Sequence, residues 1–244
     1  MKRSLLLLAF FIGSLSANGQ FSIATKYSLN SYTDWTQQLE SINFPTDQFL
    51  DNGLEYELAY WFRLKNKRIE FLPGVSFQKN SFDSKQTIDW DKTSIYLNLT
   101  AVIYPLDMEG DCNCPTFGKD GDLFSKGFFI GISPSIGSHK LQSTYTVLTN
   151  PDLPEDKTFD SNQISFRIGG VAGIDIGINK WITLTPQINV YYNPGLEWEG
   201  FETILNYQAP DQNQSVNSSI TEIQPGLKLT FRPDYLLEQR RMFR

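Results

Sequence analysis

The 244-residue sequence has only two cysteines and one histidine. Cys112 and Cys114 are two positions apart, which is poor geometry for a disulfide and supplies too few ligands for a structural zinc site. The sequence contains no G-x-S-x-G motif, so it offers no serine nucleophile of that type for the lone His139 to activate. The acidic residues around the cysteines do not follow the order of an EF-hand. We therefore expect no catalytic residues, no metal site and no cofactor, and we interpret the cysteines as a structural feature of a periplasmic loop.

The sequence also lacks a basic excess and, beyond its first residues, any long apolar run. Its net charge is −6, which opposes nucleic-acid binding. No stretch approaches the roughly 20 consecutive apolar residues of a spanning helix. The mean hydropathy of −0.31 does not argue against a membrane, because the strands of an outer-membrane barrel are individually only mildly hydrophobic.

The amino terminus has the three parts of a secretory signal peptide. A basic start at 1–3 precedes an apolar run at 5–12 and small residues at 14–19. We expect cleavage before Gln20, with cleavage after Ala17 as the alternative. The apolar run is short for a retained anchor helix, so the sequence predicts an exported protein located in the outer membrane.

Period-two alternation of apolar and polar residues dominates the rest of the chain. It is longest in 163–192, where two such runs flank a tight Asn179-Lys180 turn, a pattern that predicts a hairpin. The eight predicted strands are 21–32, 53–64, 69–78, 94–106, 128–141, 163–178, 181–192 and 220–231. Prolines recur inside four of them, which we interpret as bulges that help a sheet to curve.

The predicted connections alternate between long and short. Long polar loops are expected at 33–51, 79–93, 143–162 and 194–218, whereas 65–68 and 179–180 are tight turns and 107–127 is the cysteine loop. Long external loops and short periplasmic turns are typical of outer-membrane proteins. The sequence thus predicts an all-β fold, a single up-and-down antiparallel transmembrane β-barrel of about eight strands over residues 20–231, followed by a short basic periplasmic tail at 232–244.

The two faces of the predicted strands differ in charge. One face is apolar and rich in aromatic residues, and it carries no charged residue. The opposite face carries Lys26, Glu55, Glu57, Arg63, Glu70, Arg167, Asp175, Glu222 and Lys228. In a barrel these nine residues would form a charge network in the lumen, paired to offset desolvation. The alternative is a secreted soluble β-sandwich or lipocalin-like binding protein, in which they would face solvent.

Short motifs resemble the outer-membrane β-barrel proteins of Bacteroidota, which include PorT-like proteins, and small OmpX-like barrels. The resemblance rests on SANGQ at the cleavage region, LPG and SPS near strand starts, and the closing PGLKLTF. It implies an integral outer-membrane barrel, and PorT-like members are associated with type IX secretion. The ending also resembles the C-terminal signal that barrel-assembly machinery recognises, although thirteen residues follow Phe231 here.

Together these features predict a non-enzymatic barrel with a structural or interaction role. The expected partners are outer-membrane lipid, the barrel-assembly machinery during biogenesis and envelope or secretion-complex proteins, with no nucleic acid. An accessory role in a secretion complex is the alternative. An Ile174→Arg substitution is expected to impair assembly, at about 2–4 kcal/mol if the position lies near the membrane midplane.

Overall fold

The computed structural model describes most of the region predicted to form the barrel. The described residues are 20–41, 46, 49–50, 52–64, 67–83, 88–108, 127–150, 153–179, 181–199, 201 and 215–231. The predicted signal peptide, the tail at 232–244 and both cysteines lie outside them. Among the residues described, no helix combines the length and apolar character needed to cross a membrane.

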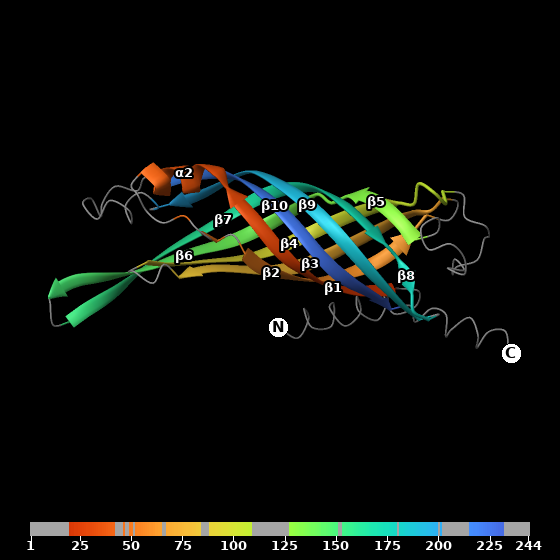
Figure 1. The fold of residues 1–244 in the computed structure, drawn as a ribbon, viewed down its shortest axis with the longest axis horizontal. Coiled ribbons are helices and arrows are strands. Elements are labelled where there is room, and N and C mark those ends of the chain that lie inside the picture. The colour runs from red at the N-terminus through yellow and green to blue at the C-terminus, as the bar shows by residue number, and fades with distance from the viewer. Residues whose placement is uncertain are drawn as a thin grey trace, which may run out of the picture.

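Antiparallel strands make up nearly all of the described chain, and one helix accompanies them (Figure 1). The elements are β1 (Gln20–Tyr32), α2 (Thr33–Ser41), β2 (Asn52–Arg63), β3 (Ile69–Asp83), β4 (Ile88–Ile103), β5 (Phe128–Ile132), β6 (Ser135–Asn150), β7 (Leu153–Ile174), β8 (Ile176–Gly177), β9 (Ile182–Glu199) and β10 (Ser215–Phe231).

Eight of these strands form a hydrogen-bonded ring. The order is β1-β2-β3-β4-β6-β7-β9-β10, and β10 pairs back with β1. The short β5 continues β6 beyond a break at Ser133 and Pro134, since both pair with β4 and β7. In the same way β8 continues β7 beyond Asp175, and both pair with β9. The predicted fold class, an up-and-down barrel of about eight strands, is confirmed.

Four prolines of the predicted strands coincide with interruptions of the ladder. Pro134 lies in the break between β5 and β6. Pro73 pairs with β4, but the β2–β3 register omits it; Pro225 pairs with β9, but the β1–β10 register omits it. Pro186 lies opposite the break between β7 and β8. Because proline has no N–H to donate, each is placed where the ladder loses a bond on one side.

The burial pattern of the strands is inverted relative to a soluble protein. Along β1 every second residue from Gln20 to Tyr32 is buried, and the residues between them are exposed. The exposed set is apolar: Ile23 is 52% exposed and Leu97 on β4 is 60% exposed. The apolar belt comprises Phe21, Ile23, Tyr27, Leu29, Leu54, Tyr56, Leu58, Phe62, Val75, Phe77, Ile95, Leu97, Leu99, Ile130, Ile132, Ile136, Ile164, Phe166, Ile168, Ile188, Val190, Tyr192, Ile223, Leu227, Leu229 and Phe231.

This belt excludes the soluble alternatives. It surrounds the ring of strands, far beyond the few hundred Å² of apolar surface that a soluble monomer tolerates. A β-sandwich or a lipocalin-like binder would bury these side chains and expose the charged ones. The opposite arrangement, apolar outside and polar inside, is that of a transmembrane barrel.

Three of the predicted loops are wrong in part. β9 runs to Glu199 and β10 begins at Ser215, both within the loop expected at 194–218. The structure continues β3 to Asp83 and resumes β4 at Ile88, within the loop expected at 79–93; it also carries β6 to Asn150 and starts β7 at Leu153, within the loop expected at 143–162. In these extensions both faces of the strands are largely polar, so the period-two signal disappears from the sequence although the strand ladder continues. The β6–β7 hairpin projects furthest from the ring (Figure 1).

The position of Ile174 also differs from the expectation. It is the last residue of β7, directly before the break at Asp175, and its side chain is only partly exposed. It therefore lies near the end with short turns, away from the middle of the belt. Leu97, which pairs with Val75 and Ile136 within the belt, is the better position for testing the effect of a charge at the midplane.

Candidate functional site

The lumen holds a network of charged side chains, and Lys26 is one of its centres. Its Nζ lies 2.9 Å from Oε1 of Glu55 and 2.5 Å from Oε2 of Glu57. Lys26 is paired directly with Glu55 across β1 and β2, and Glu57 follows two positions along the same face. Asn98 on β4 also donates to Glu57. The sequence spacing of the two glutamates thus places both carboxylates on one ammonium.

Arg167 on β7 is the second centre of the network. It donates from Nη1 to Glu222 at 2.9 Å and from Nη2 to Glu55 at 3.1 Å. Its guanidinium lies 3.5 Å from the ring centroid of Tyr96 and 4.0 Å from that of Tyr191. All five side chains are buried. The arrangement combines charge pairing with cation–π contacts on two rings.

Two glycines make room for those rings. A Cβ at Gly137 would collide with the ring of Tyr96, and a Cβ at Gly169 would collide with the ring of Tyr191. The neighbouring strands therefore carry glycine where the tyrosines lie flat against the barrel wall. This close approach lets the rings flank Arg167.

Lys92 joins the network from β4. Its Nζ lies 3.6 Å from Glu222 and donates to the hydroxyl of Tyr32 at 3.1 Å. Lys92 is absent from the predicted set because the sequence placed it in a loop, where the apolar alternation fails. The recurrence of polar residues at every second position, Asn80 on β3 and Lys92 on β4 included, is the signal that could have extended these strands.

His139 is buried in the lumen between two serines. Ser94 lies 2.8 Å from Nδ1 and Ser165 lies 2.7 Å from Nε2, and Asn193 donates to Ser165 at 2.6 Å. Each ring nitrogen thus has a hydroxyl partner, and the ring is only 1% exposed. This is the hydrogen-bonding pattern of a buried polar side chain, without access for a substrate.

A separate polar cluster lies toward the end with short turns. Glu70 accepts from the indole of Trp61 at 2.6 Å and lies 2.8 Å from the hydroxyl of Tyr104. The same hydroxyl lies 2.8 Å from Asp175, which also accepts from Thr185 at 2.5 Å. Tyr104 thus links two buried carboxyl groups from β3 and from the break between β7 and β8.

The structure places the predicted lumen residues in three groups. Lys26, Glu55, Glu57, Arg167 and Glu222 share the central network. Glu70 and Asp175 form the lower cluster with Tyr104. Lys228 lies apart, with its ammonium 5.1 Å from the ring centroid of Phe129. The backbone of Arg63 pairs with Glu70 in the β2–β3 ladder, and its side chain lies outside the description.

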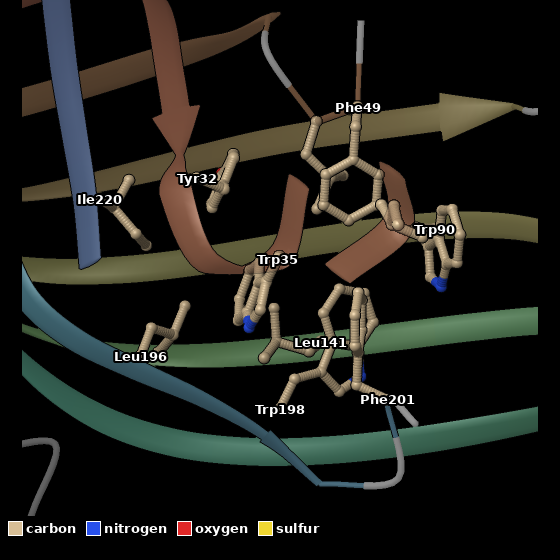
Figure 2. Close-up of a cluster of buried hydrophobic side chains, with 11 residues drawn as sticks. Tyr32, Trp35, Phe49, Trp90, Leu141, Leu196, Trp198, Phe201 and Ile220 are labelled. Atoms are coloured by element: carbon tan, nitrogen blue, oxygen red, sulfur yellow. The ribbon is translucent and has the colours of Figure 1, made fainter. Parts of the chain in front are cut away.

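A cluster of buried aromatic and aliphatic residues closes the end of the lumen that carries α2. Trp35 and Leu39 of α2 are fully buried there, and Figure 2 shows Trp35 among the other side chains of the cluster. The cluster comprises Tyr32, Trp35, Leu39, Phe49, Leu50, Trp90, Leu141, Leu196, Trp198, Phe201 and Ile220. The rings of Trp35 and Trp198 meet edge to face at 5.2 Å. Trp35 and Phe49, from the first predicted loop, therefore belong to a plug inside the barrel.

A second apolar cluster lies at the other end. It comprises Ala59, Leu72, Val102, Tyr104, Phe129 and Val171. The polar network is thus enclosed between two apolar layers. A cavity of about 10 Å³ lies in the lower lumen, and side chains normally fill the interior of an eight-stranded barrel.

The attachment of α2 to β10 yields a first test. Asp34 accepts from the backbone N–H of Ser219 at 3.1 Å, and the N–H of Asp34 donates to Ser218 at 3.1 Å. We expect Asp34→Ala to weaken the docking of α2 by about 0.5–1.5 kcal/mol, the usual net value of a hydrogen bond. Hydrogen exchange of the amides of α2 should accelerate about two- to tenfold. Exchange in the belt strands is the internal control, and an unchanged rate in α2 would contradict the assigned contact.

Within the described residues no group of three or more histidine, cysteine, aspartate or glutamate side chains is arranged to hold a metal ion. No protein-family model matches the sequence, and a search of characterised proteins found no relative. Evidence for membership of the Bacteroidota or PorT-like families is therefore lacking, and that resemblance stays a prediction.

Several solved structures match this chain at low sequence identity and with TM-scores below 0.5. Ail, the attachment invasion locus protein of Yersinia pestis, is 11% identical, with a TM-score of 0.41 over 88% of this chain and 99% of that one. A major outer membrane protein from Thermus thermophilus is 12% identical, with a TM-score of 0.45 over 87% and 99%. Neisserial surface protein A is 13% identical, with a TM-score of 0.38 over 86% and 95%. All three are outer-membrane β-barrel proteins.

Proposed function

We propose that this protein is a closed, non-catalytic outer-membrane barrel that serves as a scaffold for interactions outside the membrane. The observation that carries the proposal is the filled lumen beneath an extended external hairpin. An interlocked charge network and two apolar clusters occupy the interior, which supports a structural rather than a conducting role. The buried His139 and the paired Glu55 and Glu57 have no substrate-sized space beside them among the described residues, which favours a role without catalysis.

The β6–β7 hairpin is the element best placed to meet a partner. We assign the end with the tight turns to the periplasm and the opposite end to the exterior, following the usual asymmetry of such barrels. The β7–β9 ladder covers Ile168 to Gly173, and the N–H of Glu197 on β9 still donates to Gln163. Among the described residues, the outer portion of β7 from Leu153 to Asp160 therefore has a strand partner on one side, β6. An unpaired strand edge offers backbone donors and acceptors to an extended segment of another protein.

Shortening this hairpin tests the interaction role. Thr144 and Thr158 lie directly opposite each other. Replacing 145–157 by a two-residue Asn-Gly turn therefore preserves the β6–β7 register in the rest of the hairpin. Capture experiments with the intact and the shortened barrel should differ in bound envelope or external proteins, whereas both should migrate as folded barrels on unboiled gels. Identical capture by both proteins would contradict the assignment of the hairpin as the interaction element.

Conductance measurements test the closed lumen. Reconstituted into planar bilayers, the protein is expected to give no stable ion-conducting steps. As a control, a variant with alanine at Trp35, Trp198 and Phe201 removes three of the large rings of the plug. Stable conductance of the unmodified barrel at a level typical of porins would contradict the proposal.

A secretion-complex role is the second candidate that the sequence suggested. Its proposed contacts, the cysteine loop and the tail at 232–244, lie outside the described residues. Truncation after residue 231 followed by co-purification tests it, since that role predicts loss of a specific periplasmic partner while the barrel still folds.

A further inference from the structure

The small cavity in the lower lumen has a lining of unusual chemistry. Polar and charged side chains from five strands converge on it above an apolar floor. The lining residues are Lys26, Glu57, Leu72, Thr100, Val102, Phe129, Val171, Gln187, Asn189 and Lys228. Its volume of about 10 Å³ is close to the minimum that holds one water molecule. Polar cavities of this size are normally occupied, whereas empty cavities are apolar.

Lys228 distinguishes this cavity from the rest of the network. Its side chain is 8% exposed, and its ammonium faces the ring of Phe129 at 5.1 Å. The other buried lysines, Lys26 and Lys92, each have a carboxylate within 4 Å. Within the described residues, no carboxylate lies that close to Lys228.

The lining of the cavity contains a carboxylate, that of Glu57, but it is already hydrogen-bonded to other side chains. Glu57 accepts from Lys26 at 2.5 Å and from Asn98 at 3.3 Å, and Lys26 is shared with Glu55. Among the described residues, the three donors of the Lys228 ammonium therefore face one aromatic ring and have no protein oxygen as an acceptor. A buried ammonium without a hydrogen-bond acceptor is costly.

We propose that the cavity is a binding site for one small hydrogen-bond acceptor, a water molecule or a chloride ion, held by Lys228. The ligand accepts from the Lys228 ammonium, and the amide groups of Gln187 and Asn189 line the rest of the site. Such a ligand completes the hydrogen bonding of the lower lumen, as buried waters do in other proteins. The size of the cavity suits water, and the unpaired lysine suits an anion.

Crystal structures of the folded barrel in the presence and absence of bromide test this site. We expect electron density in the cavity at about 3 Å from Nζ of Lys228 under both conditions. An anomalous bromine signal at that position identifies a halide site, and density without that signal identifies water. An empty cavity in both crystals, or a Lys228 ammonium in a direct ion pair with a carboxylate, would overturn the proposal.

A matched pair of variants tests whether Lys228 holds the ligand. Lys228→Met keeps an unbranched side chain but removes the donors, so the density should disappear. Lys140→Met removes a lysine whose ammonium pairs with Asp160 at 3.2 Å on the exposed hairpin, and the density should stay. Retention of the density in Lys228→Met would show that other groups bind the ligand. If that variant fails to fold, the structures of the unmodified protein still decide the question.

Discussion

Replacing Arg167 by methionine is expected to lower the free energy of unfolding by about 3–5 kcal/mol, the usual cost of breaking a buried ion pair. Arg167 is fully buried and bonds two carboxylates, those of Glu55 and Glu222, which are themselves buried. Its guanidinium also stacks between two tyrosine rings. Methionine preserves much of the side-chain volume but leaves two negative charges without their shared partner. Urea-induced unfolding in lipid vesicles, followed by tryptophan fluorescence, measures the loss.

Two further variants separate this effect from a general loss of charge. Lys140→Met removes one member of an ion pair that is about half exposed, and such pairs contribute only about 0–1 kcal/mol. Without Arg167, the network keeps Lys26 and Lys92 against three glutamates. Adding Glu222→Gln to Arg167→Met should therefore recover part of the stability, because it removes this excess negative charge. A loss below about 1 kcal/mol for Arg167→Met, equal to that of the surface variant, would contradict the central role of Arg167.

Introducing arginine at Leu97 is expected to cost about 2–4 kcal/mol of folding free energy, the value for a charge near the bilayer midplane on the lipid side of a barrel. Leu97 is 60% exposed, so the substitution creates no clash inside the protein. The penalty arises only if the surroundings of Leu97 are hydrocarbon. Unfolding in vesicles and the fraction of folded protein in the outer membrane both report it.

Thr158→Arg on the external hairpin is the matched control. Thr158 is exposed and lies opposite Thr144, beyond the apolar belt. A cation there faces water and should change stability by no more than about 0.5 kcal/mol. Equal effects of the two substitutions would contradict the placement of the belt in lipid.

The barrel could be predicted from sequence because lipid and lumen impose opposite chemistry on alternate residues. Where both environments act, as along 21–32, the predicted and observed strands agree. Beyond the apolar belt both faces carry mostly polar residues, so the alternation vanishes, and the pattern predicts loops over 79–93 and 143–162 where the strands continue. A single-sequence pattern cannot show a strand whose two faces have similar polarity.

The sequence predicts which charged residues face the lumen, but it does not predict which of them form ion pairs with one another. The face that carries Glu55, Arg167 and Glu222 follows from periodicity, whereas their meeting depends on the strand order and stagger of the closed ring. The plug was also not predicted. Trp35 belongs to a segment that reads as polar, and its burial depends on Trp198 from the far end of the chain.

The accessibility of a spin label at position 97 tests the central claim most directly. With both native cysteines replaced by serine and Leu97→Cys labelled with a nitroxide in reconstituted bilayers, collisions with oxygen and with a water-soluble nickel complex report the depth of the label. The inverted barrel described here predicts high accessibility to oxygen and very low accessibility to nickel at Leu97, with the reverse at Thr158→Cys. High nickel accessibility at Leu97 would place the apolar belt in water and contradict the account.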